Sequence, residues 1–99
     1  MSTFQKFRTY ELSIQFYKEC KQIRLPATLK DQLIRAASSV TLNLAEGSAK
    51  PSRKERVRFY TIAFASLREV QALIRLEDLT GLHPKADHLG ACLYKLTNQ

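Results

Sequence analysis

Five basic side chains within nine residues are the group in this chain best suited to binding an anion. They surround one acid, Glu55, and are Lys50, Arg53, Lys54, Arg56 and Arg58. Phosphate oxygens are natural ligands for such a cluster. The cluster begins the longest predicted helix, where the partial positive charge of a helix N-terminus favours Asp or Glu instead. Because folding gains nothing from this placement, we predict an anionic partner, above all nucleic acid.

Further bases are predicted to extend this surface along the same helix. Positions 54, 61, 68 and 75 are seven residues apart, which places Lys54, Arg68 and Arg75 on one side of the helix. The stripe spans roughly 30 Å at 1.5 Å per residue, enough to meet several phosphates. Lys30 and Arg35 in the preceding helix complete the candidate contacts. We expect no aromatic between these bases, which favours backbone contact with little sequence preference.

The net charge of +7, from 16 Lys and Arg against nine Asp and Glu, fits a polyanion as partner. Two alternatives remain. The basic surface can be a solvated face, or Arg68 and Arg75 can pair with acids such as Glu69 and Glu77 or with a neighbouring subunit.

No catalytic motif is present. The two histidines, His83 and His88, fit no metal-ligand or nucleophile pattern, so we predict no enzyme activity, no cofactor and no metal. RNA-cleaving bundles of the HEPN type carry Arg, four to six residues and then His, whereas seven residues separate Arg75 from His83.

The cysteines and the hydropathy pattern indicate where the protein works. Cys20 and Cys92 lie among apolar residues at helical spacing, which predicts buried free thiols in a reducing compartment. The N-terminal residues do not resemble a signal peptide, and no apolar run is long enough to span a membrane. We therefore predict a cytoplasmic protein.

Four helices must position these residues, in a single domain over residues 1–99. We expect them at 4–24, 27–46, 53–80 and from about Pro84 onward. Gly47 is predicted to end the second helix in the left-handed conformation, and Gly81 to follow the third. Ser52 and Glu55 form a capping box that starts the third. Short connections favour an all-α, up-down-up-down antiparallel four-helix bundle.

Two helices carry more apolar surface than one core requires. The helix at 4–24 has one stripe at Leu12, Phe16, Cys20 and Ile23, and a second at Phe7, Tyr10, Ile14 and Tyr17. The third helix has an apolar arc of roughly 200°, which includes Phe59. Since surplus apolar patches usually mark interfaces, we predict a homo-oligomer.

Polar residues also fall among these apolar positions. Ser66 lies within the arc of the third helix, and Asn43 and Glu46 flank the stripe of the second. Asn43 and Glu46 can form a functional site or act as structural hydrogen-bonding groups, and we favour the structural role.

The segment from residue 35 to 74 resembles the signature of a bacterial four-helix-bundle family. That family includes proteins encoded in intervening sequences of ribosomal RNA genes and the Avd accessory proteins of diversity-generating retroelements. The residues that carry the resemblance are Ala36, Ala37, Ser39, Asn43, Ala45, Glu46, Gly47, Ser52, Glu55, Arg58, Phe59, Ala63, Ser66, Leu67 and Glu69.

The resemblance implies a ring-like homopentamer of bundles with a basic surface and no catalytic residues. Avd-type members bind nucleic acid and associate with a reverse transcriptase. Our leading prediction is therefore a non-catalytic scaffold for RNA or an RNA–DNA hybrid. The alternative is a protein-interaction module of the intervening-sequence type, without a direct role on nucleic acid.

Overall fold

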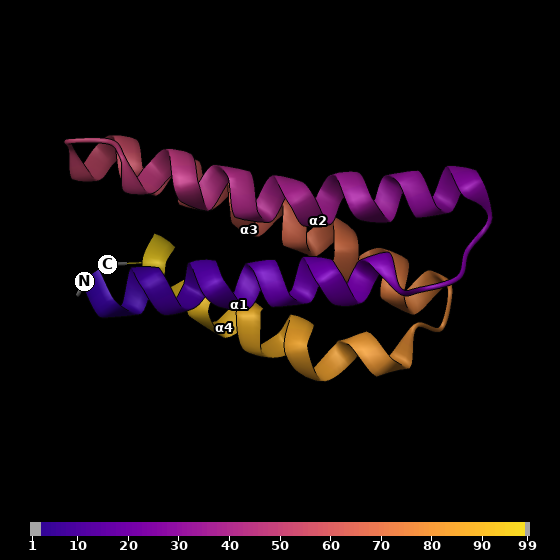
Figure 1. Ribbon diagram of the computed structural model, residues 1–99. Helices are drawn as coiled ribbons and strands as arrows, with labels where there is room; N and C mark the ends of the chain where they lie inside the picture. Colours follow the sequence, from indigo (N-terminus) through magenta and orange to yellow (C-terminus); the bar gives the residue numbers. More distant parts are fainter. Residues whose placement is uncertain (1–2, 99) are drawn as a thin grey trace.

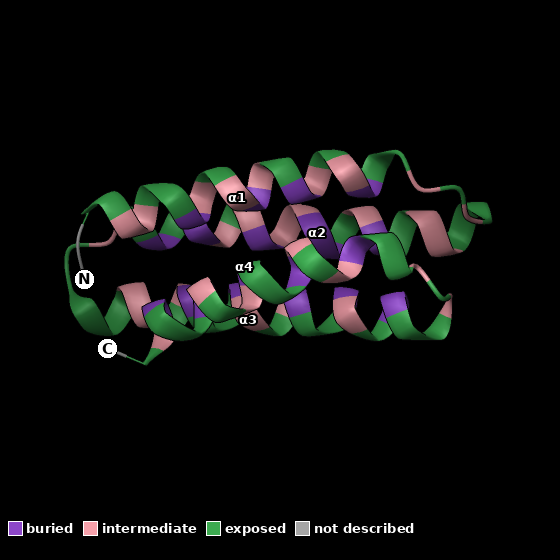
Figure 2. Ribbon diagram, turned by 90° about the horizontal axis from the view of Figure 1, so that it is seen from below, coloured by how far each residue is buried: buried purple, intermediate pink, exposed green. Residues whose placement is uncertain are grey.

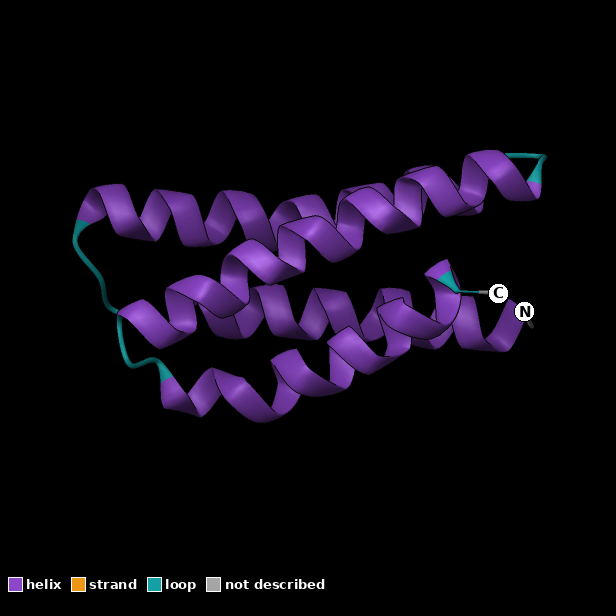
Figure 3. Ribbon diagram, turned by 180° about the vertical axis from the view of Figure 1, so that it is seen from behind, coloured by secondary structure: helices purple, strands orange, loops and turns teal. Residues whose placement is uncertain are grey.

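The computed structural model describes residues 3–98, which form an all-helical structure without strands (Figure 3). Its elements are α1 (Thr3–Lys21), α2 (Ala27–Ser48), α3 (Arg53–Leu76), the short 3-10 helix η1 (Thr80–Leu82) and α4 (His83–Thr97). The prediction of four helices is confirmed. None of the helices in this range is long and apolar enough to cross a membrane.

Successive helices run in opposite directions, as the path of the chain in Figure 1 shows. Each helix packs against two neighbours, and α1 against α4 closes the arrangement. The bundle is elongated, with extents of 41 × 22 × 18 Å. The most extensive packing joins α2 and α3, so the turn that carries the basic cluster lies at the end of the best-packed helix pair.

The core lies along the inward sides of all four helices, where Figure 2 shows the buried residues. Leucine and alanine dominate it, and large and small side chains alternate as close packing requires. Its members are Phe16, Cys20, Leu33, Ala36, Ala37, Val40, Leu44, Tyr60, Ala63, Leu67, Val70, Leu73, Ile74, Leu82, Ala86, Leu89, Leu93 and Leu96.

Helix α2 does not end at Gly47, which corrects the prediction. The helix continues to Ser48, and Gly47 has no positive φ. A Cβ atom at this position would lie 2.8 Å from Tyr60 Cε1 and 3.0 Å from Phe59 Cβ. Glycine is therefore required because α2 and α3 approach closely, and a left-handed helix end plays no part.

Helix α3 ends four residues earlier than predicted, at Leu76. Asp78 takes a positive φ of 54°, and the backbone N–H of Leu79 donates to the Ile74 carbonyl at 2.9 Å. This hydrogen bond, which spans five residues (the 6→1 pattern), is typical of a Schellman-type helix end. Aspartate tolerates the left-handed region better than most residues, so the chain turns here without using Gly81.

The two cysteines differ in their surroundings. Cys20 is fully buried in the core, as predicted, whereas Cys92 is only half-buried and that part of the prediction is wrong. Both thiols are free. Burial raises the pKa of the Cys20 thiol to about 12, with a smaller contribution from the charge of Glu19 that Lys30 partly offsets. Cys20 is therefore an unreactive core residue.

Candidate nucleic-acid interface

The turn between α2 and α3 is held in one conformation by its own side chains. Ser52 Oγ accepts from the Glu55 backbone N–H at 3.1 Å, which confirms Ser52 as the N-cap, and the Glu55 carboxylate accepts from the Ser52 hydroxyl rather than from the Ser52 backbone. Arg56 Nη1 donates to the carbonyls of Lys50 and Pro51, at 3.2 and 3.0 Å. Arg56 therefore fixes the turn and is only partly available to a ligand.

Two cations of the turn lie near an aromatic ring, whereas we expected no aromatic residue among the bases. Lys50 Nζ lies 5.2 Å from the centre of the Phe59 ring, and the Arg58 guanidinium lies 5.8 Å from it. Lys50 also pairs with Glu46 at 3.3 Å. Phe59 is half-buried, so part of its ring meets solvent. The same ring makes cation–π contacts with two basic side chains.

Among residues 3–98, the basic stripe of α3 has no acidic partner. Lys54, Arg68 and Arg75 are exposed, and the ion pairs among residues 3–98 involve only Lys50 with Glu46 and Lys85 with Glu19. The alternative in which Arg68 and Arg75 pair with acids of the same chain is therefore not observed within this range. Arg53 and Arg58 are likewise exposed and without an ion pair there.

Arg68 lies beside the ring of Phe64, which in turn contacts an aromatic ring of α4. Its guanidinium is 4.8 Å from the centre of Phe64, and its Nη1 donates to Gln71 Oε1 at 2.9 Å. Phe64 packs edge-to-face with Tyr94 of α4, at 6.5 Å between ring centres. A depression of about 370 Å³, hereafter the α3–α4 groove, is lined by Phe64, Arg68, Gln71, Asp87, Gly90 and Tyr94.

The two bases predicted from α2 differ in their surroundings. Lys30 Nζ donates to the Lys21 carbonyl at 2.8 Å and to that of Ile23, so it satisfies carbonyl groups at the C-terminal end of α1. This end comes at Lys21, three residues before the predicted one. Arg35 is exposed near the middle of α2.

Asn43 and Ser66 belong to a hydrogen-bonded group between α2 and α3. Asn43 Nδ2 donates to the Ser39 carbonyl and hydroxyl, at 2.8 and 3.0 Å, and the Ser39 and Ser66 hydroxyls are 2.9 Å apart. Glu46 is exposed and pairs with Lys50 instead, and Glu69 is exposed. The arrangement supports structural roles for Asn43 and Ser66.

An apolar surface lies on the outer side of α1 and α2. The second stripe of α1 is half-buried or exposed rather than in the core, with Phe7 60% exposed, and Leu42 of α2 is 67% exposed. We name this surface the α1–α2 face, and it comprises Phe7, Tyr10, Ile14, Tyr17 and Leu42. It includes an almost wholly apolar depression of about 250 Å³ beside Ile14 and Leu42.

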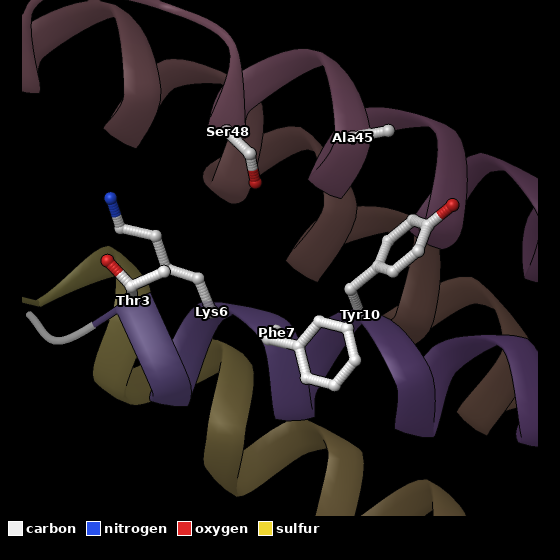
Figure 4. A pocket seen from close by; sticks show the side chains of 6 residues that line it. All are labelled: Thr3, Lys6, Phe7, Tyr10, Ala45 and Ser48. Atoms are coloured by element: carbon white, nitrogen blue, oxygen red, sulfur yellow. The ribbon is translucent and has the colours of Figure 1, made fainter.

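One end of the α1–α2 face is hollowed further. Figure 4 shows side chains of α1 and α2 around a space of about 400 Å³, which is lined by Thr3, Lys6, Phe7, Tyr10, Ala45 and Ser48. A folded chain rarely leaves several large apolar side chains together in solvent. This surface therefore has the composition of a contact region.

A depression of about 420 Å³ between α1 and α4 is lined by Glu11, Lys85, His88 and Cys92, among other residues. No group of three His, Cys, Asp or Glu side chains in the part of the chain that the structure describes is arranged to hold a metal ion. Arg75 lies near the end of α3, while His83 begins α4 beyond η1.

Comparison with known proteins bears on the resemblance directly. The family model of the 23S rRNA-intervening sequence protein matches residues 4–97, which takes in all four helices. No curated protein and no solved structure matches the chain significantly. Because the match extends over nearly the whole bundle, the chain belongs to the family of 23S rRNA-intervening sequence proteins.

Proposed function

We propose that this protein is a non-catalytic nucleic-acid-binding scaffold. The observation that carries the proposal is the set of exposed cations without ion pairs along α3 and its first turn, namely Arg53, Lys54, Arg58, Arg68 and Arg75. None of these five side chains pairs with an acid among residues 3–98, so their charges are available to a ligand. A phosphate backbone supplies the missing negative charge.

The ligand we propose is RNA or an RNA–DNA hybrid, read mainly through its backbone. Point charges on long side chains position a strand without identifying its bases. We further propose that copies of the chain associate through the α1–α2 face, in a homopentamer as the family resemblance implies. Repeated basic surfaces in such an assembly strengthen binding by raising the effective concentration of phosphate sites.

Binding measurements at several salt concentrations test this function. Fluorescence anisotropy with a structured RNA and a duplex DNA is expected to show affinity that falls as salt rises, because each neutralised phosphate releases counterions. In the test variant, alanine replaces four bases of the interface, namely Lys54, Arg58, Arg68 and Arg75. The control removes the same charge from exposed residues elsewhere, namely Lys18, Lys21, Arg24 and Lys95.

The two variants have the same net charge. A difference in their affinity therefore shows that binding depends on the position of the bases and not only on the total charge. We expect the stripe variant to bind much more weakly and with a smaller salt slope, by about one unit for each phosphate that is no longer neutralised. The control is expected to bind nearly as the wild type does. Equally weakened binding by both variants, or no binding by the wild type, would contradict the proposal.

The alternative function, a protein-interaction module, has one observation in its favour. The α1–α2 face is apolar and exposed, and such a surface suits a protein partner better than a phosphate. Association with another copy accounts for this face without a further partner. An accessory role beside a reverse transcriptase stays a prediction from the resemblance alone.

A further inference from the structure

We infer that the α3–α4 groove binds an unpaired nucleobase, so that the protein prefers single-stranded segments of its ligand. This inference rests on the proposed function and deepens it. Contacts to the phosphate backbone alone distinguish paired from unpaired strands only by their charge density. A base held in a groove beside the basic stripe instead selects strands whose bases are free to leave the stack.

The groove contains the components of a stacking site. Tyr94 is 58% exposed, although it contacts Phe64 edge-to-face. Such a contact joins the edge of one ring to a face of the other, so at least one face of the Tyr94 ring takes no part in it. Arg68 lies at the rim, with its guanidinium held by Phe64 and Gln71. A base on Tyr94 therefore has its phosphate within the field of a positioned cation.

The polar groups of the groove suit a base better than a second phosphate. Asp87 lines it from α4 and Gln71 from α3. A carboxylate repels phosphate but accepts hydrogen bonds from the exocyclic amino group of a base, and an amide both donates and accepts. The single cation is Arg68, on the side of the groove that continues the basic stripe. The phosphate is therefore expected beside Arg68, and the edge of the base beside Asp87 and Gln71.

Gly90 supplies an independent observation. It lies inside α4, where glycine is less favourable than alanine. Its φ is not positive, and a Cβ atom would meet Leu67 and Gln71 at 3.5 and 3.6 Å, which is ordinary contact. Neither the backbone nor the packing of α4 therefore requires glycine. Gly90 lines the α3–α4 groove, and because it has no side chain a ligand can approach the backbone of α4 closely there.

Two substitutions test the groove with different consequences for folding. Gly90→Ala is expected to raise the melting temperature while it fills the groove, and Tyr94→Ala removes the stacking ring. The probes are labelled single-stranded RNA and DNA of one sequence, the same strands with abasic sites, and the duplex. We expect Tyr94→Ala to bind both single strands about 5- to 150-fold more weakly, the range given by removal of one stacked base. Gly90→Ala is expected to weaken the same binding because its methyl group narrows the groove.

The controls separate the groove from the rest of the interface. Tyr94→Phe keeps the ring and is expected to bind as the wild type does, whereas Arg75→Ala is expected to weaken single strands and duplex alike. Abasic strands are expected to bind the wild type and Tyr94→Ala equally.

Two different failures can be told apart. Gly90→Ala and Tyr94→Ala proteins that bind single strands as tightly as the wild type would overturn the groove and leave the scaffold function standing. A wild-type protein that binds none of these probes would overturn both.

Discussion

A methyl group at position 47 has no free space between α2 and α3. The ring of Tyr60 would lie 2.8 Å from it, and Tyr60 is only 3% exposed, so the ring cannot move aside into solvent. We expect Gly47→Ala to lower the free energy of unfolding by about 1–3 kcal/mol, the usual effect of overpacking. Chemical denaturation measures it.

Gly81→Ala is the matched control for this substitution. No atom lies within 4 Å of its added Cβ, and its φ is not positive. Its stability is expected to equal or slightly exceed that of the wild type, because alanine restricts the unfolded chain. A Gly47→Ala protein as stable as Gly81→Ala would show that the two helices can move apart at no cost.

Residue types alone do not separate the bases that hold the fold from those that are free. The sequence predicts that Lys30 and Arg56 contact nucleic acid, yet both donate to backbone carbonyls. The carbonyls that Lys30 reaches belong to the end of another helix, whose position depends on tertiary packing. Among residues 3–98, Arg75 has no such partner, and Arg68 donates to the Gln71 side chain rather than to the backbone. The sequence therefore predicts the charge of the surface more reliably than its members.

At the scale of the helix, the start of α3 depends on one serine. The first turn of α3 contains Arg53 and Lys54, which oppose the helix dipole, and Glu55 is its only acid. Ser52 satisfies the Glu55 N–H. We expect Ser52→Ala to reduce the free energy of unfolding by about 1 kcal/mol, as for other N-caps. Denaturant titration measures the difference.

Ser48→Ala provides the comparison for the cap. Its hydroxyl bonds to the Leu44 carbonyl within the same helix, an interaction that adds little to helix stability. We expect this variant to unfold at nearly the wild-type denaturant concentration. If both serines prove equally dispensable, the turn is held by Arg56 rather than by the cap.

Helix starts are more predictable than helix ends. The capping box at Ser52 uses neighbouring residues, so the start of α3 can be read locally. Its end depends on Asp78 in the left-handed region, a conformation that the nearby Gly81 is even better able to adopt. At the end of α1, the Lys21 carbonyl accepts a hydrogen bond from Lys30, nine residues further along the chain.

At the scale of the whole molecule, the bundle topology follows from short connections, whereas the α3–α4 groove does not. A helical wheel places Phe64 and Arg68 on α3 but does not identify the helix that covers them. The contact with Tyr94 requires a particular rotation of α4, and that rotation results from core packing. The expectation that no aromatic lies among the bases fails for this reason.

The α1–α2 face leads to a prediction about the assembly. Phe7 and Leu42 are exposed in the single chain, so glutamate at these positions disturbs no core contact. We expect the wild type to have the solution mass of five chains, and the Phe7→Glu, Leu42→Glu double variant to be a folded monomer, because charges desolvated in an apolar interface strongly oppose association. Size-exclusion chromatography with light scattering measures the masses.

Leu76→Glu is the control for the added charge. Leu76 is 74% exposed at the end of α3, outside the α1–α2 face, and this variant is expected to keep the wild-type mass. An oligomer that survives the double substitution would place the interface elsewhere on the bundle.

Because binding through repeated basic stripes depends on assembly, the double variant is also expected to bind nucleic acid more weakly although every base is retained. A monomer with undiminished affinity would show that one bundle is sufficient for the interface.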